Sequence, residues 1–315
     1  MLKDIKKKLL SGVIILSIYL GVPCIITLLV TGIVPENVSD EIINGRRVEV
    51  KYNNATKSVE VNKFIIMVLA DKLSLSSEVE VIKAESIMIR TDIYRMMGED
   101  YSISSEKLGM SYITERGMKS RWGSEYEEKY NLLADCVAAT NGIVILYNDK
   151  LIEAKMQALS NGKTLSGSRC LGDEYAYLSE VECPGDIKSP DFLQVKTFSN
   201  KEFVKKIQNS YKDVGLDEKN PMSGIQIVSK TDSGYVLKIQ VGNVVMSGAT
   251  FAGIMEINSS CLTIEKADSG IKITTKGCGD GFGVSIYHAD EMAKEGSTYE
   301  DILKKFYSSI TLASR

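Results

Sequence analysis

An uncharged, apolar run of 26 residues from Leu9 to Val34 is the feature that most constrains this chain. A helix of about 20 apolar residues spans a hydrocarbon core of roughly 30 Å, so the run is long enough to cross a membrane with some tilt. Pro23 is compatible with this interpretation, because membrane helices accommodate proline. The lysines that precede the run predict a cytoplasmic N-terminus and a body on the other side of the membrane. The sequence therefore predicts a single-pass protein of the cell membrane, held by an uncleaved signal-anchor.

A cleaved signal peptide, a lipoprotein and a buried core helix fit the run less well. A cleaved signal peptide would have a shorter apolar region followed by a cleavage site with two small residues separated by one, and the sequence has neither. A lipoprotein modified at Cys24 is disfavoured, because Pro23 precedes the cysteine and the apolar run continues for ten residues beyond it. The length and the flanking residues disfavour a buried core helix. The predicted organisation is a basic cytoplasmic tail (1–8), a transmembrane helix (9–34), a juxtamembrane linker (35–45) and an extracytoplasmic domain (46–315).

The body that follows the run is mildly acidic. Residues 35–315 hold 34 basic and 40 acidic side chains, whereas residues 1–34 hold four lysines against one aspartate. Nucleic-acid binding needs a basic patch that replaces phosphate counterions, so we expect no nucleic acid as a partner. His288 is the only histidine, which excludes a multi-histidine zinc site, and we expect no metal and no other cofactor.

Five cysteines lie in the predicted extracytoplasmic body: Cys136, Cys170, Cys183, Cys261 and Cys278. An odd number leaves at least one thiol unpaired in a non-reducing space. Cys170 and Cys183 could pair across a loop, and the simpler alternative is that most of the five are small buried thiols.

Strand and helix patterns alternate in mixed order along the body, which predicts an α+β fold. Alternating or apolar segments predict strands over 47–51, 57–61, 143–147, 151–156, 224–247 and 260–276, with a hairpin turn at Asn148-Asp149. Apolar periodicity and capping signals predict helices over 64–72, 77–94, 125–140, 199–211, 285–295 and 298–307. Capping boxes are expected at Ser77/Glu80 and Ser199/Glu202, and Ser297 and Glu300 are expected to cap the last helix. Residues 160–176 are expected to form a polar loop.

Four glycines alternate through residues 277–283 (GCGDGFG) between a predicted strand and a predicted helix. Their spacing fits neither GxGxxG nor GxxxxGK[ST], so we expect no nucleotide as a ligand. The better physical interpretation is a backbone that approaches another group closely.

Seven segments, in order over roughly residues 46–310, match the motifs of one known family. Residues 61–73 (VNKFIIMVLADKL) look like LEEYIxGVVAxEMP, and 80–91 then fall without a gap on ExxLKAQAxxART. Further matches are 141–164 with TxGxVxxYxGxxIxAxYHSxSGGxT, 177–186 with YLxSVxSPxD, 246–251 with LSGxxFR, 276–285 with KGxGHGVGMSQ, and 292–303 with AMAKEG and YEEIL. The chain thus resembles the stage II sporulation protein D family, the SpoIID/LytB domain of spore-forming bacteria.

The resemblance implies a membrane-anchored protein that acts on peptidoglycan glycan strands, as the family's lytic transglycosylases do during engulfment. In that chemistry a single carboxyl protonates the glycosidic oxygen and then, as carboxylate, assists attack by the sugar's own 6-hydroxyl. The family's glutamate precedes Met-Pro, and Lys72 occupies its position here. An ammonium with an unperturbed pKa near ~10 is poorly suited to exchange protons near neutrality. Asp71 is adjacent, and a one-residue slip would make it the catalytic acid with a shorter reach.

Other polar motif positions also differ from the family pattern. Gln157 and Asp280 replace its two histidines, and Ile286 replaces its glutamine. Glu85 and Arg90 lie on one predicted helix, where a carboxylate–guanidinium contact and a substrate role are both open. The side chains that the resemblance suggests for glycan binding are Gln157, Ser160, Lys163, Thr164, Asp280 and Ser285.

Three functions follow as hypotheses. The first is a degenerate enzyme (a pseudoenzyme) that binds or positions glycan strands, in sporulation or engulfment, and has lost glycan cleavage. The second is an active lytic transglycosylase that uses Asp71. The third is a membrane scaffold for cell-wall or sporulation membrane proteins, in which the cleft has no role.

Overall fold

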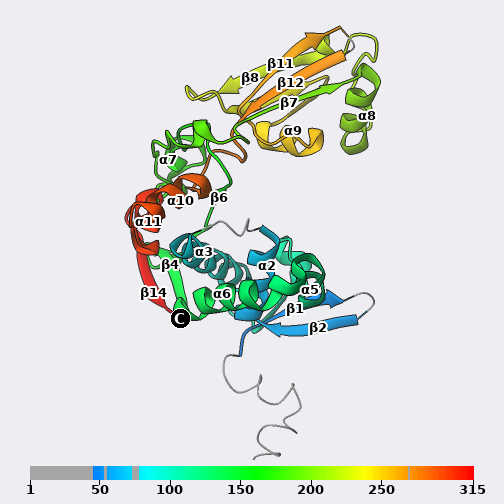
Figure 1. Ribbon diagram of the computed structural model, residues 1–315. Helices are drawn as coiled ribbons and strands as arrows, with labels where there is room; N and C mark the ends of the chain where they lie inside the picture. The colour runs from blue at the N-terminus through cyan, green and yellow to red at the C-terminus, as the bar shows by residue number, and fades with distance from the viewer. Residues whose placement is uncertain (1–44, 53–54, 73–77, 269) are drawn as a thin grey trace, which may run out of the picture. The chain divides into compact units, whose positions relative to one another are not determined.

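The structure is a computed structural model that describes residues 45–52, 55–72, 78–268 and 270–315 (Figure 1). Their contacts divide into two compact units. The described part of the first is residues 45–52, 55–60 and 99–105, and the second holds the described residues from 61 to 98 and from 106 to 315. The mixed order of helices and strands confirms the predicted α+β class.

The first unit is a three-stranded sheet. Its strands are β1 (Arg47–Tyr52), β2 (Ala55–Glu60) and β3 (Ser102–Ser104), in the order β2-β1-β3. β1 pairs antiparallel with β2 and parallel with β3. The alternating pattern that predicted β1 is real, since Val48 and Val50 are buried while their neighbours are more exposed. β3 was not predicted, because three residues carry too little pattern to recognise.

Three helices of the second unit pack against one another: α2 (Val61–Lys72), α3 (Val79–Met97) and α6 (Tyr126–Ala139). Arg90 of α3 is fully buried, and its guanidinium donates to the carbonyls of Val137 and Thr140 at 3.3 and 2.7 Å. It thereby satisfies carbonyls that the C-terminal end of α6 leaves without intrahelical partners. The contact between Arg90 and Glu85, one of the two alternatives left open by the sequence, is not formed, because Arg90 uses its donors here and on Asn62.

The predicted hairpin turn is confirmed, although the second strand is shorter than the predicted 151–156. β4 (Ile143–Tyr147) pairs antiparallel with β5 (Lys150–Leu151), and Asn148 and Asp149 between them have φ of 50° and 60°. Positive φ at both central residues is the requirement of the tight hairpin turn, and Asn and Asp tolerate it well. β14 (Thr311–Ser314), which was not predicted, adds to the other edge of β4.

The C-terminal helices α10 (Ile286–Lys294) and α11 (Tyr299–Phe306) pack on α3 and share its apolar core, where Met88, Ile302 and Phe306 are fully buried. The predicted cap of the last helix was wrong by one residue: Thr298 and Asp301 form the capping box. The α3 cap also differs from the prediction, since Glu78 is the N-cap and the Glu80 carboxylate accepts from Tyr299 N and Lys83 instead. Ser77 lies outside the described residues.

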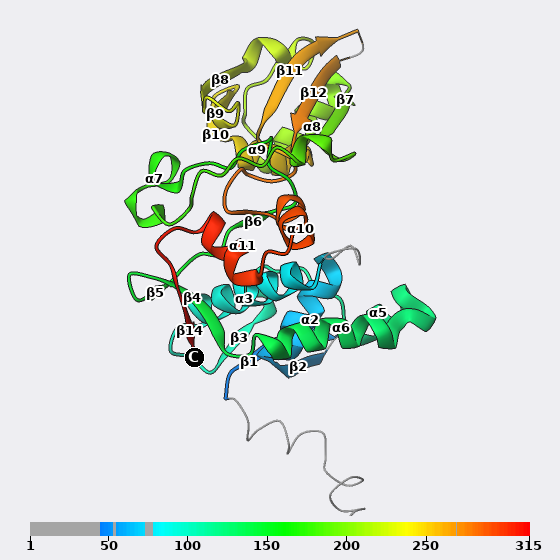
Figure 2. The same ribbon diagram turned by 60° about the vertical axis from the view of Figure 1, so that its left-hand side comes forward.

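A second apolar core in the same unit lies among two three-stranded sheets and two helices. One sheet has the order β11 (Leu262–Ala267), β12 (Gly270–Lys276) and β7 (Leu193–Phe198). The other has the order β10 (Val244–Ser247), β9 (Val236–Val241) and β8 (Ile225–Lys230). α8 (Asn200–Ser210) and α9 (Gly248–Met255) lie beside these strands in both views (Figure 2). Ser199 caps α8 by accepting from Glu202 N, which confirms the predicted cap, but the Glu202 side chain does not make the return bond of the predicted capping box. The other strands and short α-helices in the described residues are β6 (Met156–Gln157), β13 (Val284–Ser285), α4 (Ser105–Leu108), α5 (Glu115–Trp122) and α7 (Gly167–Cys170).

The predicted transmembrane helix over 9–34 and most of the predicted linker lie outside the described residues. Within the part that is described, no helix is long and apolar enough to cross a bilayer.

Candidate functional site

A pocket of about 650 Å³ lies in the second unit, which we call the Gln157 pocket. Its wall combines residues of α2, α3, β6 and α10 with loop residues. Pockets of this size hold small ligands or segments of longer ones. Five of the lining side chains carry charge: Lys72, Glu85, Asp191, Asp290 and Lys294. The others are Met156, Gln157, Ala158, Leu159, Ser189, Pro190, Asn258, Cys278, Ile286 and Tyr287.

Glu85 is the most unusual of these side chains. Twelve of the 19 residues of α3 are buried, and Glu85, only 3% exposed, is one of them. Its Oε2 atom has no hydrogen-bond partner among the described residues. Burial raises the pKa of the carboxyl to about 7, against the opposing charge of Lys72 and with the support of Asp290. Near neutral pH this carboxyl therefore exists in both its charged and its neutral form.

Gln157 reaches the pocket from β6, which pairs with β13 in a short parallel bridge. Its Oε1 accepts from the backbone N–H of Gly281 at 2.9 Å, which fixes the direction of the amide. Its buried Nε2 has no partner in the described structure. A buried donor without a partner carries a desolvation cost of about 1–3 kcal/mol, which a ligand oxygen would relieve.

The glycines of 277–283 hold this arrangement in place. Gly279 and Gly283 have φ of 144° and 73°, in the region that favours glycine. A Cβ on Gly279 would lie 2.3 Å from Gln157 Cβ, and one on Gly283 would lie 1.8 Å from the carbonyl oxygen of Lys155. The expected close approach of this backbone to another group is confirmed, and the group is the segment that carries Gln157.

Asp186 is a buried residue whose carboxylate accepts hydrogen bonds from two of the predicted site residues, Ser160 and Ser285. Its Oδ2 accepts from Ser160 N at 2.7 Å, from Ser160 Oγ at 2.6 Å and from Ser285 Oγ at 2.8 Å. All three residues are fully buried. Burial raises the pKa of Asp186, although the serine hydrogen bonds counteract it. Ser160 and Ser285 were predicted to contact glycan. In the structure their hydroxyls donate to Asp186 instead, and neither residue lines the Gln157 pocket.

The Asp186 cluster gives a stability prediction. Asp186→Ala removes the shared acceptor of three hydrogen bonds and leaves the buried donors of Ser160 and Ser285 without it, so we expect a loss of about 1–3 kcal/mol of unfolding free energy. Urea unfolding of the full-length protein in detergent measures it. Asp213→Ala, at an exposed position, is the matched control and should change little. An equal effect of the two substitutions would contradict the assigned role of the cluster.

Lys163 and Thr164 lie near Ser160 in sequence but not in the Gln157 pocket. The Lys163 ammonium lies 2.5 Å from Glu180 and 2.9 Å from Glu182, on the wall of a separate pocket of about 530 Å³. Thr164 is fully buried, and its hydroxyl donates to the Ser179 carbonyl and accepts from Val181 N, both at 2.8 Å. The structure therefore does not bring these two together with Gln157.

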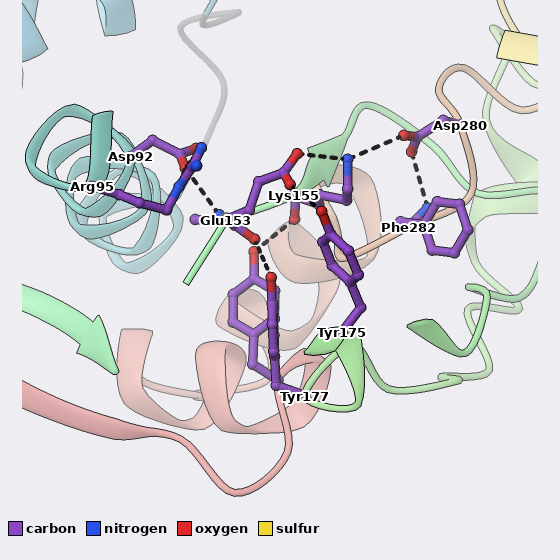
Figure 3. Close-up of polar contacts among 10 residues, drawn as sticks. Asp92, Arg95, Glu153, Lys155, Tyr175, Tyr177, Asp280 and Phe282 are labelled. Carbon is purple, nitrogen blue, oxygen red and sulfur yellow. Dashed lines mark hydrogen bonds and ion pairs between the residues drawn. The ribbon is translucent and has the colours of Figure 1, made fainter. Parts of the chain in front are cut away.

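Asp280 takes part in a polar network next to the glycine loop (Figure 3). Its Oδ1 accepts from Phe282 N at 3.1 Å, and its Oδ2 lies 3.9 Å from the Lys155 ammonium. Lys155 also pairs with Glu153 at 2.9 Å. Burial alone would lower the pKa of Lys155, but the hydrogen bond to Glu153 and the charge of Asp280 raise it. Asp280 thus fixes its own loop and neutralises a half-buried lysine.

The cysteines and the single histidine have ordinary surroundings. All five described cysteines are free, so Cys170 and Cys183 are not joined. Within the described ranges no group of three or more His, Cys, Asp or Glu side chains is arranged to hold a metal ion. His288 packs edge-on against Phe306 and lies 3.4 Å from Glu291.

Comparisons with known proteins agree with the motif matches. The family model described as Stage II sporulation protein matches residues 50–147. The stage II sporulation protein D of Bacillus subtilis (strain 168) is 30% identical over 273 residues, which cover 83% of this chain and 78% of that protein. This chain belongs to the stage II sporulation protein D family. The Bacillus amyloliquefaciens protein of the same name is 27% identical over 83% of this chain and 76% of its own length. The amidase enhancer of Bacillus subtilis is 23% identical over 78% of this chain and 40% of its own length.

Family membership gives weight to the position that Lys72 occupies. Lys72, which the motif match predicts to stand at the family's glutamate position, lines the Gln157 pocket. Asp71, the alternative acid, does not line it. Its carboxylate lies 3.4 Å from the Arg121 guanidinium instead. The side chains of these neighbours in α2 thus lie in different surroundings, as the turn of about 100° per residue requires.

Two residues that the structure makes important were not among the predicted site residues. Asp186 lies in the motif match over 177–186 without a predicted role, and Glu85 was predicted only to contact Arg90 or a substrate. A local signal for Glu85 does exist, since it lies between Ala84 and Ile87 on the apolar side of its helix. A charged residue on an apolar helix face is rare enough to mark a site.

Proposed function

We propose that this stage II sporulation protein D relative binds peptidoglycan glycan strands in the Gln157 pocket and acts in sporulation. Its family, and the sporulation and amidase-enhancer names of its relatives, support this class of ligand. The proposal includes membrane anchoring through residues 9–34, with the N-terminus cytoplasmic and the body extracytoplasmic.

The observation that carries the proposal is the pair of buried, partnerless atoms in one pocket. Gln157 Nε2 donates, and Glu85 Oε2 accepts when ionised or donates when protonated. Sugar hydroxyls and acetamido groups offer both donors and acceptors at short spacing. The apolar wall that includes Met156 and Ile286 suits the carbon faces of sugar rings.

The proposal does not include glycan cleavage by a residue at the position of the family's glutamate. Lys72 stands at that position, and the Asp71 carboxylate pairs with Arg121 outside the pocket. Asp71 therefore has no support from the geometry as a catalytic acid. We propose that the protein has lost glycan cleavage at the Lys72 position.

Binding is tested with Gln157→Ala. Loss of one hydrogen bond to a ligand costs about 1–1.5 kcal/mol, so we expect about tenfold weaker co-sedimentation of the full-length protein with purified cell-wall sacculi. The control is Gln208→Ala, an exposed glutamine on α8. Thermal unfolding of each variant shows that the protein remains folded. A wild-type protein that does not sediment with sacculi refutes the proposal, as does full binding by a folded Gln157→Ala protein.

A further inference from the structure

Glu85 has properties that binding alone does not require. It is almost completely buried, its Oε2 has no partner, and it lies on the wall of the pocket rather than in the closed core. Burying a carboxyl without a hydrogen bond is costly, and replacement by an apolar residue would remove that cost. A stability argument therefore does not account for a carboxyl at this position.

The other carboxyls of the pocket are arranged differently. Asp290 accepts from the backbone N–H of Glu78 at 3.0 Å, at the start of α3, and Asp191 is exposed to solvent. Glu85 is the one of these three that combines burial with a partnerless oxygen. It is thus the best placed of them to exchange a proton with a bound ligand.

Compared with the family motifs, the carboxyl is missing at the Lys72 position and an additional carboxyl is present at the Glu85 position. Lys72 stands where the motif has glutamate, and Glu85 stands where KAQA has glutamine. Both line the same pocket, and the Lys72 charge acts on the Glu85 carboxyl. The carboxyl lost from α2 is thus present on α3, on another wall of one cavity.

We propose that Glu85 is the catalytic acid and base of a glycan-cleaving activity of the Gln157 pocket, in place of the carboxyl lost at Lys72. The proposal rests on the proposed binding of glycan strands there. Lys72 acts as a positioning residue, because its charge stabilises the carboxylate that forms when Glu85 gives up its proton.

The reaction balances without any added reactant. Glu85, protonated, gives its proton to the glycosidic oxygen as the bond from that oxygen to the anomeric carbon breaks. The 6-hydroxyl of the same sugar forms the new bond to the anomeric carbon, and its proton returns to Glu85. The products are one strand ending in a 1,6-anhydro sugar and one ending in a free 4-hydroxyl. Since water does not enter, one carboxyl is sufficient, whereas hydrolysis uses two. A carboxyl with a pKa of about 7 is populated in both required forms near neutrality.

The experiment incubates full-length protein in detergent with peptide-free glycan strands and measures 1,6-anhydro ends by mass spectrometry. We expect the wild type to produce them and Glu85→Gln to produce at least about 100-fold fewer for the same amount of protein bound to the strands. Asp71→Asn is the matched control and should retain the wild-type rate. The wild-type rate should also change with pH around neutrality, in the range where Glu85 titrates beside Lys72, Asp290, Lys294, Asp191 and Tyr287.

The outcomes separate this inference from the proposed function. Wild-type protein that binds sacculi but yields no anhydro ends at any pH overturns the role of Glu85 and leaves binding intact. Cleavage that persists in Glu85→Gln, or that disappears in Asp71→Asn, overturns it as well. If the wild type does not bind sacculi, the proposed function fails first and the role of Glu85 fails with it.

Discussion

Glu85→Gln should stabilise the protein by about 3 kcal/mol near pH 8, and by progressively less as the pH falls towards 4. The raised pKa of Glu85, about 7 against 4.5 for the unperturbed group, means that folding favours the protonated form. Above pH 7 the folded protein holds a buried, ionised carboxyl, which lowers the free energy of unfolding. The size of this cost follows from the difference between the folded and unfolded pKa, at about 1.4 kcal/mol per pH unit. Glutamine preserves the shape and carries no charge, so it removes the penalty.

The sign follows from proton linkage. The stabilising contribution of a carboxyl whose folded pKa is raised is fully present below the unfolded pKa and is lost as the pH rises through the folded pKa. The difference in unfolding free energy between Glu85→Gln and the wild type should therefore grow between about pH 4.5 and 7 and then level off. Urea unfolding at a series of pH values measures this difference directly.

Glu80→Gln on the same helix provides a control of opposite sign. Burial alone would raise the pKa of Glu80, but its contacts with Lys83 at 2.6 Å and with Tyr299 N at 2.8 Å lower it overall. Its contribution is present above the unfolded pKa and is lost as the pH falls through the folded pKa, so Glu80→Gln should destabilise at neutral pH. If Glu85→Gln behaved like Glu80→Gln, or showed no dependence on pH, the buried state of Glu85 would be disproved.

Local patterns predicted much of the fold because their causes are local. The Asn148-Asp149 turn depends on two residues that tolerate positive φ, and the Ser199 cap depends on a residue three positions away. The alternate glycines likewise indicated a close backbone approach, although not its target. The last helix shows the limit of such signals: Ser297/Glu300 and Thr298/Asp301 are both acceptable pairs in sequence, and geometry selects the second.

The candidate site depended on contacts that no local pattern contains. Ser160 and Ser285 were matched to glycan-binding motifs, yet both hydroxyls lie on Asp186, which is 26 residues from the first and 99 from the second. Gln157 was predicted and does line the pocket, whereas Glu85 acquires its unusual environment from residues on α2 and α10. α9 was missed because eight residues with two glycines give a weak helical signal.

Gly283→Ala should cost about 4 kcal/mol of unfolding free energy, a large loss for a single added methyl group. The added Cβ would lie 1.8 Å from the Lys155 carbonyl oxygen and 3.0 Å from Lys155 Cβ, and the backbone φ is 73°. The same carbonyl accepts from Val284 N at 3.0 Å, next to the bridge between β6 and β13. Relief of the clash therefore has to separate the two strands that place Gln157 and Ser285.

Gly296→Ala isolates the conformational part of this cost. Gly296 also has a positive φ, 96°, but a Cβ there meets nothing within 4 Å. Its substitution should cost only the strain of the backbone, about 1 kcal/mol. Urea unfolding of both variants gives the steric contribution as the difference, and sacculi sedimentation should weaken for Gly283→Ala alone. Equal losses in the two variants would mean that the loop does not press against the Lys155 segment, and the close approach that orders the Gln157 pocket would then have to be abandoned.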